Sequence, residues 1–290
     1  MPPVVIDGVR AIRDRVSPAA SGSVDVTPWS PGYWDARERL VRDALADSQL
    51  MQTFRSGGTL PPHYGTGFDE RCIEYPWAAS QLEPGVATML DAGSTLNHEH
   101  FLSQPVLAGK RLFILTLAPE RNCFWQRGIS YLFSDLRDIP VRDSFFDLIT
   151  CLSTLEHVGC DNAFYAGEDG GSHDGDMRTA MQEFRRVLKP RGSLLLTVPF
   201  GRRQVFREFQ QFDRAALDQA VDSFGPADVA SAFYRYSADG WNTANPADCA
   251  SSEFVRWVTE PRESRSPVAP LEPDYAAAAR AVACVRITKR

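Results

Sequence analysis

The feature that most constrains the fold is the stretch 87–97, in which a short apolar run ends in Asp91 and Gly93 and then leads into a helix-like pattern. Glycine adopts backbone angles that other residues avoid, so the chain can turn sharply at Gly93 and pass close to a ligand. Three side chains typical of helix N-caps follow, namely Ser94, Thr95 and Asn97. They predict a helix over residues 97–107, and the strand, turn and helix together indicate one unit of an α/β sheet.

Further units of the same kind follow along the chain. Apolar strand patterns occur at 88–92, 111–117, 130–134, 146–152 and 193–199. A helical apolar face covers 177–188, and Lys189-Pro-Arg-Gly192 ends it, because proline cannot continue a helix. A helix at 214–224 precedes two strands at 230–236 and 281–288, expected to pair antiparallel at the sheet edge. The sequence predicts a seven-stranded, mostly parallel sheet with helices on both faces.

The first third of the chain is expected to form a cap on this sheet. Apolar residues at helical spacing over 34–54 predict an amphipathic helix. The segment 61–77 is dense in aromatic and charged residues, which is compatible with either a lid or a structured connector. We therefore predict an N-terminal arm, helix and lid or connector over 1–84, and an α/β domain over 85–290 with an insert at 158–176 and C-terminal edge strands.

Composition narrows the possible partners and the compartment. The 290 residues carry a net charge of −6 and no run of Lys or Arg, which argues against nucleic acid as a ligand. The six cysteines are scattered, as expected in a reducing cytoplasm. No apolar run approaches the roughly 18 residues needed for a membrane span, and no secretory signal pattern is present. These features predict a cytoplasmic protein whose partners include neither nucleic acid nor a membrane.

In an open parallel sheet, ligands bind beyond the carboxyl ends of the strands. Three blocks around these ends resemble the class I S-adenosylmethionine-dependent methyltransferases: Leu90-Asp-Ala-Gly93, the stretch 135–147, and the stretch 183–192. The resemblance runs from about Glu74 to Gly201. The segment 64–77 and Glu156-His-Val-Gly159 further resemble a subgroup associated with bacterial glycan or natural-product biosynthesis. The resemblance implies a Rossmann-like transferase that uses S-adenosylmethionine and releases S-adenosylhomocysteine.

The same resemblance implies a set of cofactor contacts. They are Asp91, Gly93, Ser94, Thr95 and Asn97 at the methionine end, Thr116 and Glu120 near the ribose, Asp135 and Leu136 at the adenine, and Ser153 and Thr154 after the fourth strand. Asp91 and Asn97 could instead only fix the turn. The sequence departs from the family twice: the glycine-rich pattern stops at Gly93, and Thr116 stands where an acid usually binds the ribose. Glu120, one helical turn later, could reach back to supply a carboxylate.

Two residues after the fourth strand are candidates for moving a proton. His157 has an ordinary pKa near neutrality and its position in such folds faces the cofactor methyl group. Glu156 could orient His157 or itself be the base. A histidine that only caps the loop is the alternative. If either residue moves the proton, His157 and Glu156 are the catalytic residues of this protein.

Substrate contacts are expected from aromatic and charged side chains. The candidates are Tyr64, Arg71, Tyr75 and Trp77 in the lid or connector, and Tyr234 and Trp241 as a wall for stacking a sugar; core packing is the alternative for all of them. The insert carries Asp161, Glu168, Asp169, His173, Asp174 and Asp176. We expect a solvated loop there and no metal site, with magnesium held by its oxygen atoms as the alternative.

The sequence thus predicts methyl transfer from S-adenosylmethionine to an oxygen of a sugar or natural product, with a small-molecule or glycan acceptor. Three alternatives stay open. A degenerate methyltransferase-like scaffold subunit would explain both departures at the cofactor contacts. Transfer to nitrogen or carbon fits the same motifs. A nicotinamide dehydrogenase would share the first strand and turn, but Gly-x-Gly-x-x-Gly is absent. The acceptor, the methylated atom and the oligomeric state are not encoded in any motif that we identify.

Overall fold

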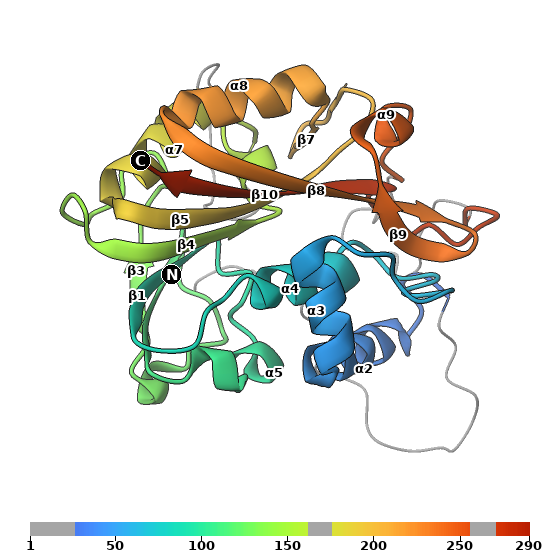
Figure 1. Cartoon of the computed structure of the whole chain (residues 1–290), viewed down its shortest axis with the longest axis horizontal. Coiled ribbons are helices and arrows are strands. Elements are labelled where there is room, and N and C mark those ends of the chain that lie inside the picture. The colour runs from blue at the N-terminus through green and yellow to red at the C-terminus, as the bar shows by residue number, and fades with distance from the viewer. Residues whose placement is uncertain (1–26, 162–175, 256–270) are drawn as a thin grey trace, which may run out of the picture.

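The computed structural model describes residues 27–161, 176–255 and 271–290. Within these residues, eight strands form one sheet in the order β3-β2-β1-β4-β5-β10-β8-β9 (Figure 1). The strands are β1 (Ala87–Ala92), β2 (Lys110–Thr116), β3 (Ser130–Phe133), β4 (Phe146–Leu152), β5 (Leu188–Pro199), β8 (Ala227–Ser237), β9 (Gly240–Ala244) and β10 (Ala281–Lys289). A separate short hairpin pairs β6 (Gln204–Val205) with β7 (Gln210–Gln211).

The sheet is parallel on one side and antiparallel on the other. Strands β3, β2, β1, β4 and β5 run parallel to one another. Strand β10 pairs antiparallel with both β5 and β8, and β9 pairs antiparallel with β8. The predicted class of fold is confirmed, but the described sheet has eight strands and not seven. The additional strand is β9, so the predicted antiparallel pair of β8 and β10 lies inside the edge and not at it.

Helices cover both faces of the sheet (Figure 1). One face carries α2 (Tyr33–Ala46), α3 (Ser48–Ser56), α4 (Arg71–Ser80) and α5 (Glu99–Leu102), and the opposite face carries α7 (Asp176–Val187) and α8 (Arg214–Phe224). The remaining helical pieces are α9 (Pro246–Cys249) and the 3-10 turns η2 (Pro105–Leu107), η3 (Trp125–Arg127) and η4 (Leu155–His157). No helix in the described ranges is long and apolar enough to cross a membrane.

The apolar side chains of the central strands are buried on both faces of the sheet. Along β1, Met89 packs in the core beneath α2, α3 and α4, whereas Leu90 packs in the core beneath α7 and α8. Alternate side chains of a strand point to opposite faces, so a run that is apolar at every position requires cover on both sides. The N-terminal helices therefore share a continuous core with the sheet.

Two predicted helices differ from those observed. The helix expected over 34–54 is two helices, because the Asp47 carboxylate accepts hydrogen bonds from Gln49 N and Leu50 N and so caps the start of α3. The helix expected over 97–107 is reduced to α5 and η2. Gln104 precedes a proline and is extended, with ψ of 136°, which interrupts the helix. Helix α8 matches its predicted range, and α7 ends at Val187, before the predicted stop.

The segment 61–77 is a structured connector and part of the core. Every residue of α4 except its first is buried. Glu74 lies fully buried inside this helix, where its Oε1 accepts hydrogen bonds from Ser153 Oγ (2.5 Å) and Thr197 Oγ1 (2.7 Å). Arg71 Nη1 donates to Glu74 Oε2 at 2.7 Å. A buried carboxylate is tolerated when its oxygens are satisfied in this way, and the network fixes the start of α4 to the end of β4.

Candidate functional site

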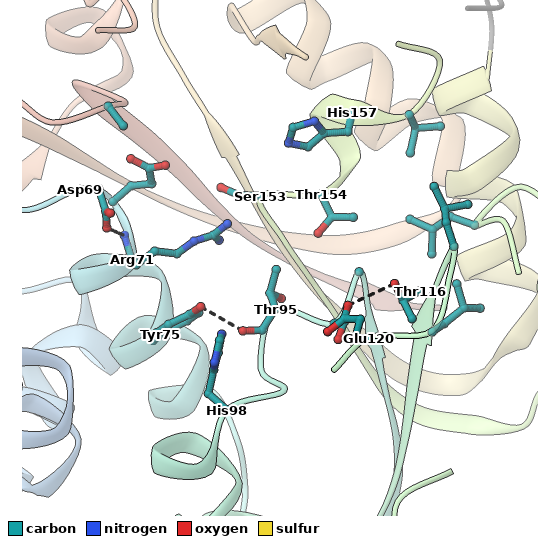
Figure 2. A pocket seen from close by; sticks show the side chains of 18 of the residues that line it. Asp69, Arg71, Tyr75, Thr95, His98, Thr116, Glu120, Ser153, Thr154 and His157 are labelled. Carbon is teal, nitrogen blue, oxygen red and sulfur yellow. Dashed lines mark hydrogen bonds between the residues drawn. The ribbon is translucent and has the colours of Figure 1, made fainter. Parts of the chain in front are cut away.

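A cavity of about 460 Å³ opens at the carboxyl ends of the parallel strands (Figure 2). This volume suits a small-molecule site, and its position is where α/β sheets bind ligands. We call its two sides the strand-end half and the helical half. The strand-end half contains Gly93–Thr95, Leu115–Leu117, Glu120, Ser134–Arg137, Ser153, Thr154 and His157. The helical half contains Trp29, Trp34, Arg37, Asp69, Glu70, Arg71 and Tyr75.

The turn after β1 consists of two consecutive residues with left-handed backbone angles. Gly93 has φ of 108° and Ser94 has φ of 59°. A Cβ atom on Gly93 would lie 2.3 Å from Thr154 Oγ1, so only glycine fits where the turns after β1 and β4 meet. Ser94 lines the cavity, and its buried Oγ has no hydrogen-bond partner in the described part of the chain. A serine thus holds the backbone conformation that a second glycine would otherwise supply.

Asp91 and Asn97 lie behind this turn and do not line the cavity. The buried Asp91 carboxylate accepts hydrogen bonds from Leu96 N (2.9 Å) and Thr150 Oγ1 (3.2 Å), and burial raises its pKa to about 7. Asn97 Nδ2 donates to the carbonyl oxygen of Asn122 at 2.9 Å. The expectation that side chains after Gly93 cap a helix is wrong, because α5 begins after His98 without a side-chain cap. Both residues instead fix the turn, the alternative stated above.

A carboxylate lies beside the end of β2. Thr116 Oγ1 donates a hydrogen bond to Glu120 Oε1 at 3.2 Å, and Asn97 Nδ2 approaches Glu120 Oε2 at 3.4 Å. Thr116 and Glu120 both line the cavity. The expectation that Glu120 reaches back toward Thr116 is confirmed. The negative charge that the end of β2 lacks is therefore supplied from four residues further along the chain.

The turn after β3 contains an internal ion pair. Arg137 donates to both carboxylate oxygens of Asp135, through Nε at 2.9 Å and Nη2 at 2.7 Å. These hydrogen bonds overcome the effect of burial and lower the pKa of Asp135 below its ordinary value. Leu136 is buried and lines the cavity beside this pair. A ligand that binds Asp135 would share it with Arg137, which the sequence analysis did not anticipate.

Ser153, Thr154 and His157 line the cavity where β4 ends (Figure 2). His157 Nδ1 lies 2.8 Å from the carbonyl oxygen of Glu208. A carbonyl oxygen only accepts hydrogen bonds, so Nδ1 carries the proton and Nε2 of the neutral ring keeps its lone pair. Burial is the main cause that lowers the pKa of His157 to about 4, and the Arg71 charge adds to it. The ring is therefore neutral at physiological pH.

Glu156 is placed differently from its neighbour. It does not line the cavity, its side chain is buried, and its Oε2 has no hydrogen-bond partner among the described residues. Burial raises its pKa well above the ordinary value, and the nearby Glu74 carboxylate adds to this. The expectation that Glu156 acts directly on a ligand as a base is therefore contradicted by its position behind the cavity wall.

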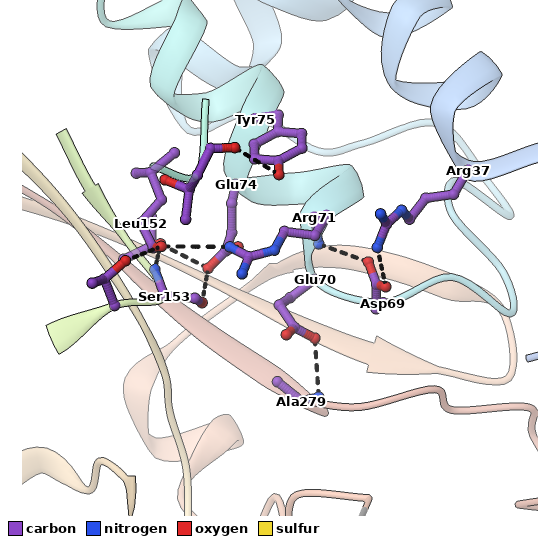
Figure 3. Close-up of polar contacts among 12 residues, drawn as sticks. Arg37, Asp69, Glu70, Arg71, Glu74, Tyr75, Leu152, Ser153 and Ala279 are labelled. Atoms are coloured by element: carbon purple, nitrogen blue, oxygen red, sulfur yellow. Dashed lines mark hydrogen bonds and ion pairs between the residues drawn. The ribbon is translucent and has the colours of Figure 1, made fainter. Parts of the chain in front are cut away.

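The helical half is held together by two ion pairs (Figure 3). Arg37 Nη1 lies 2.5 Å from Asp69 Oδ2, and Arg71 pairs with Glu74. Tyr75 OH donates to the carbonyl oxygen of Thr95 at 3.0 Å and so joins α4 to the turn after β1. Arg71 and Tyr75 are thus brought to the cavity as predicted.

Four predicted substrate residues do not reach the cavity, namely Tyr64, Trp77, Tyr234 and Trp241. All four are buried in the core beneath α2, α3 and α4. Tyr64 OH donates to the carbonyl oxygen of Cys72, and Trp241 Nε1 donates to that of Phe68. The expectation of a stacking wall formed by Tyr234 and Trp241 is wrong, because large apolar rings contribute most when they are fully buried.

Other cavity residues were missed by the sequence analysis. Trp29, Trp34, Arg37 and Glu70 line the helical half. Glu70 belongs to the segment 61–77 that was singled out for its charge, and Trp34 and Arg37 lie on a helix for which only packing was expected. Their side of the helix could not be assigned to a ligand without knowing where α2 lies. In the insert, Glu168, Asp169, His173 and Asp174 lie outside the described residues, so the solvated loop without a metal site stays a prediction, with magnesium as its alternative.

One family model and a number of solved structures are similar to this chain. A family model described as a methyltransferase domain matches residues 114–196. No curated protein matches the chain. A Burkholderia thailandensis 1,6-didemethyltoxoflavin-N1-methyltransferase is similar at 14% identity and a TM-score of 0.44, over 95% of this chain and 93% of its own. A Thermotoga maritima methyltransferase is similar at 15% identity and a TM-score of 0.43, over 89% and 100%.

A Galdieria sulphuraria protein assigned as a sarcosine dimethylglycine methyltransferase is similar at 18% identity and a TM-score of 0.40. The similar region is 55% of this chain and 60% of the length of that protein. Similarity at this level gives no information about the substrate of this chain. The matched residues 114–196 run from β2 into β5 and include the ends of β2, β3 and β4. The part of the chain that matches the methyltransferase-domain model thus contains strand ends that border the cavity.

Proposed function

We propose that this protein transfers a methyl group from S-adenosylmethionine to an oxygen atom of a sugar or natural product in the cytoplasm. The observation that carries the proposal is the shape of the cavity, in which a strand-end half with the Gly93–Ser94 turn adjoins an aromatic and charged helical half. One half suits a nucleoside-containing donor and the other a small polar acceptor. The six free cysteines support a reducing compartment.

Three observations support the fit of the donor. Gly93 and Ser94 both line the cavity, so the backbone of the turn after β1 borders the space that a ligand would occupy. The unpartnered Ser94 hydroxyl suits a polar methionine group. The Glu120 carboxylate, held by Thr116 and Asn97, suits the paired hydroxyls of a ribose. Asp135 and Leu136 would border the adenine. When bound, S-adenosylmethionine supplies a methyl group on a positively charged sulfur.

The acceptor would lie in the helical half. Trp29, Trp34 and Tyr75 provide flat apolar surface, and Asp69 and Arg71 provide polar groups at its edge. Rings that carry hydroxyl groups combine apolar faces with polar edges, which suits this mixture. His157 Nε2 would accept a hydrogen bond from the acceptor hydroxyl, with Nδ1 fixed by Glu208.

Methyl transfer needs little covalent chemistry from the protein. The attacking oxygen, the methyl carbon and the sulfur must be held in line, and water must be kept out. In this chain the turns after β1 and β4 would position the donor, and α2 and α4 would position the acceptor. The ties between Tyr75 and Thr95, and between Glu74 and Ser153, hold these two groups of elements in a fixed relation.

The proposal is tested by calorimetric titration of the protein with S-adenosylmethionine and S-adenosylhomocysteine, with NAD as the control. We expect micromolar binding of the first two and none of NAD. A panel of hydroxyl-bearing sugars and phenols, with amines as the counterpart, would then be screened for formation of S-adenosylhomocysteine. Binding without turnover on any acceptor would favour the scaffold alternative, and turnover on amines alone would reassign the methylated atom.

A further inference from the structure

A short hairpin outside the main sheet reaches the ring of His157. Strands β6 and β7 form this hairpin and pair antiparallel. We call residues 206–209, which join the two strands, the hairpin tip. The backbone N–H of Phe206 donates to the carbonyl oxygen of Phe209 at 2.8 Å and closes the tip into a compact turn.

Two consecutive residues of the tip contact the imidazole of His157. The carbonyl oxygen of Glu208 lies 2.8 Å from His157 Nδ1. The ring of Phe209 is tilted by 49° to the imidazole, with 5.8 Å between the ring centroids. Because both contacts come from the tip, its position determines which ring nitrogen is bound and how the ring is oriented.

The contact with Glu208 also determines where the proton of the neutral ring lies. In a free neutral imidazole side chain the proton resides mainly on Nε2, so the form with the proton on Nδ1 needs a partner at that nitrogen. The Glu208 carbonyl is this partner, because a carbonyl oxygen only accepts hydrogen bonds. The lone pair of His157 is thereby left on Nε2.

The tip is itself attached to the chain near His157. Arg207 Nε donates to Asp161 Oδ2 at 2.7 Å, and the backbone N–H of Asp161 donates to the carbonyl oxygen of Arg207 at 3.0 Å. Asp161 follows η4 in the sequence, four residues after His157. The carbonyls of Arg207 and Glu208 therefore both receive hydrogen bonds from this part of the chain, which fixes the tip against it.

The base of the hairpin is attached to the loop that carries Phe254. Gln211 is fully buried, and its Nε2 donates to the carbonyl oxygen of Ser252 at 2.9 Å. The backbone N–H of Phe254 donates to Gln204 Oε1 at 2.7 Å. Phe254 lines the cavity, and its ring centroid lies 4.7 Å from that of Phe209. Phe209 thus contacts both His157 and a second residue of the cavity wall.

We propose that the hairpin tip positions His157: the Glu208 carbonyl selects the form with the proton on Nδ1, and the Phe209 ring fixes the orientation of the imidazole. The part that His157 plays toward an acceptor rests on the proposed function. Glu208 and Phe209 do not line the cavity, so they are positioning residues that act through His157. A ring with its proton on Nε2 would donate at that nitrogen and could not receive the acceptor hydroxyl.

NMR of the whole protein with ¹⁵N-labelled histidine reads this state directly and needs neither donor nor acceptor. The chain has five histidines, so the spectrum is simple, and the signals that disappear in His157→Asn identify this residue. The ¹⁵N shift of a ring nitrogen changes strongly when it carries a proton. At pH 7 we expect the proton of wild-type His157 on Nδ1.

The decisive variant replaces residues 206–209 by Asn-Gly, which forms a two-residue hairpin turn and leaves the residues of β6 and β7 in place. It removes the Glu208 carbonyl and the Phe209 ring together, and we expect the proton to lie mainly on Nε2. Val205→Ala is the matched control, because Val205 lies on the same hairpin, is 68% exposed and does not line the cavity. It should behave as wild type.

Two substitutions of Phe209 test the ring separately. Phe209→Ala removes the contact that orients the imidazole, so both forms of the neutral ring should be populated. Phe209→Leu keeps apolar bulk at this position and should restore the wild-type form. If the tip replacement unfolds the protein, the signals of the other histidines change as well, and the two Phe209 variants then decide the outcome.

Turnover provides a second readout with any acceptor found in the panel above. The tip replacement should lower kcat about as far as His157→Asn, with the affinity for S-adenosylhomocysteine unchanged. Combining the two changes should cost no more than either alone, because both remove the same hydrogen bond to the acceptor. Fully additive losses would overturn the positioning role.

The outcomes separate this inference from the proposed function. A proton on Nε2 in wild-type His157, or on Nδ1 equally in wild type, the tip replacement and Phe209→Ala, overturns the inference and leaves the methyltransferase proposal standing. A change in the tip replacement alone keeps the role of Glu208 and overturns that of Phe209. If S-adenosylmethionine does not bind to the wild-type protein, the proposed function fails, and the spectrum still decides whether the tip controls His157. A changed spectrum in the tip replacement and Phe209→Ala, with Val205→Ala and Phe209→Leu as wild type, supports the inference.

Discussion

Thr116 Oγ1 donates a hydrogen bond to Glu120 Oε1 at 3.2 Å, which brings a carboxylate to the end of β2 although the strand ends in a neutral residue. Removing this charge should weaken a donor bound through its ribose. We expect Glu120→Gln to lower the affinity for S-adenosylmethionine and S-adenosylhomocysteine by about 10- to 100-fold, as for one charged hydrogen bond. Thr116→Val only loosens the carboxylate and should cost about fivefold or less. Calorimetry measures both, and equal affinities in all three proteins would contradict the placement of the ribose.

Gly93 and Gly85 provide a matched pair for testing the turn after β1. Their φ angles are 108° and 110°, but a Cβ atom would collide with Thr154 at Gly93 and meets nothing within 4 Å at Gly85. Gly85→Ala should cost about 1 kcal/mol of stability through backbone strain alone. Gly93→Ala should cost about 2 kcal/mol or more and abolish donor binding. Urea unfolding and ligand titration of both variants check this, and similar losses would show that the contact with Thr154 is unimportant.

His157 should act without a change of charge in the working pH range. Because its pKa is lowered to about 4, the rate should show no inflection between pH 5 and 7 that depends on this residue. His157→Asn can keep the hydrogen bond to Glu208 while it removes Nε2, and we expect turnover to fall about 10- to 100-fold with donor affinity unchanged. Steady-state kinetics and titration separate the two effects. Full turnover in this variant would remove His157 from the reaction.

Stability should decrease as the pH rises. The folded-state pKa of Glu70, about 8, lies above its unfolded value, so folding favours the protonated form. The contribution is complete below about pH 4.5 and is lost as the pH rises through 8. Asp91, with a pKa of about 7, acts in the same direction. Urea unfolding at pH 6 and pH 9 should show a loss that is smaller in Glu70→Gln by about 1–2 kcal/mol, since the group is partly exposed.

The corrected roles of two tryptophans can be tested together. Trp241 is buried and donates through Nε1 to the carbonyl oxygen of Phe68, whereas Trp34 lines the cavity. Trp241→Phe should lower stability by about 1–3 kcal/mol through the lost hydrogen bond and volume, and leave the acceptor KM unchanged. Trp34→Phe should change the acceptor KM with less effect on stability. The reverse pattern would restore Trp241 as a substrate contact.

The sequence predicted most of the sheet because each of these strands is a short continuous segment with a clear pattern of apolar residues. β4 and α8 match their predicted ranges, and the other long elements differ mainly at their ends. β9 was missed because its residues 240–244 alternate weakly and pair only through the tight turn from β8. The interrupted helix after Gly93 depended on Gln104, whose extended backbone reflects the proline that follows. Short elements whose stability comes from neighbours in space give little local signal.

The sequence by itself determined the parallel sheet, the turn at Gly93 and the group of residues that follow the strand ends, because each depends on backbone preference and on the pattern of apolar residues. Only the tertiary structure decided which side chains face the cavity. It placed Asp91, Asn97 and Glu156 behind the cavity wall, Tyr234 and Trp241 in the core, and Glu70 in the helical half of the cavity. The orientation of a side chain depends on the packing of distant elements, here α4 against the end of β4, which no local pattern encodes.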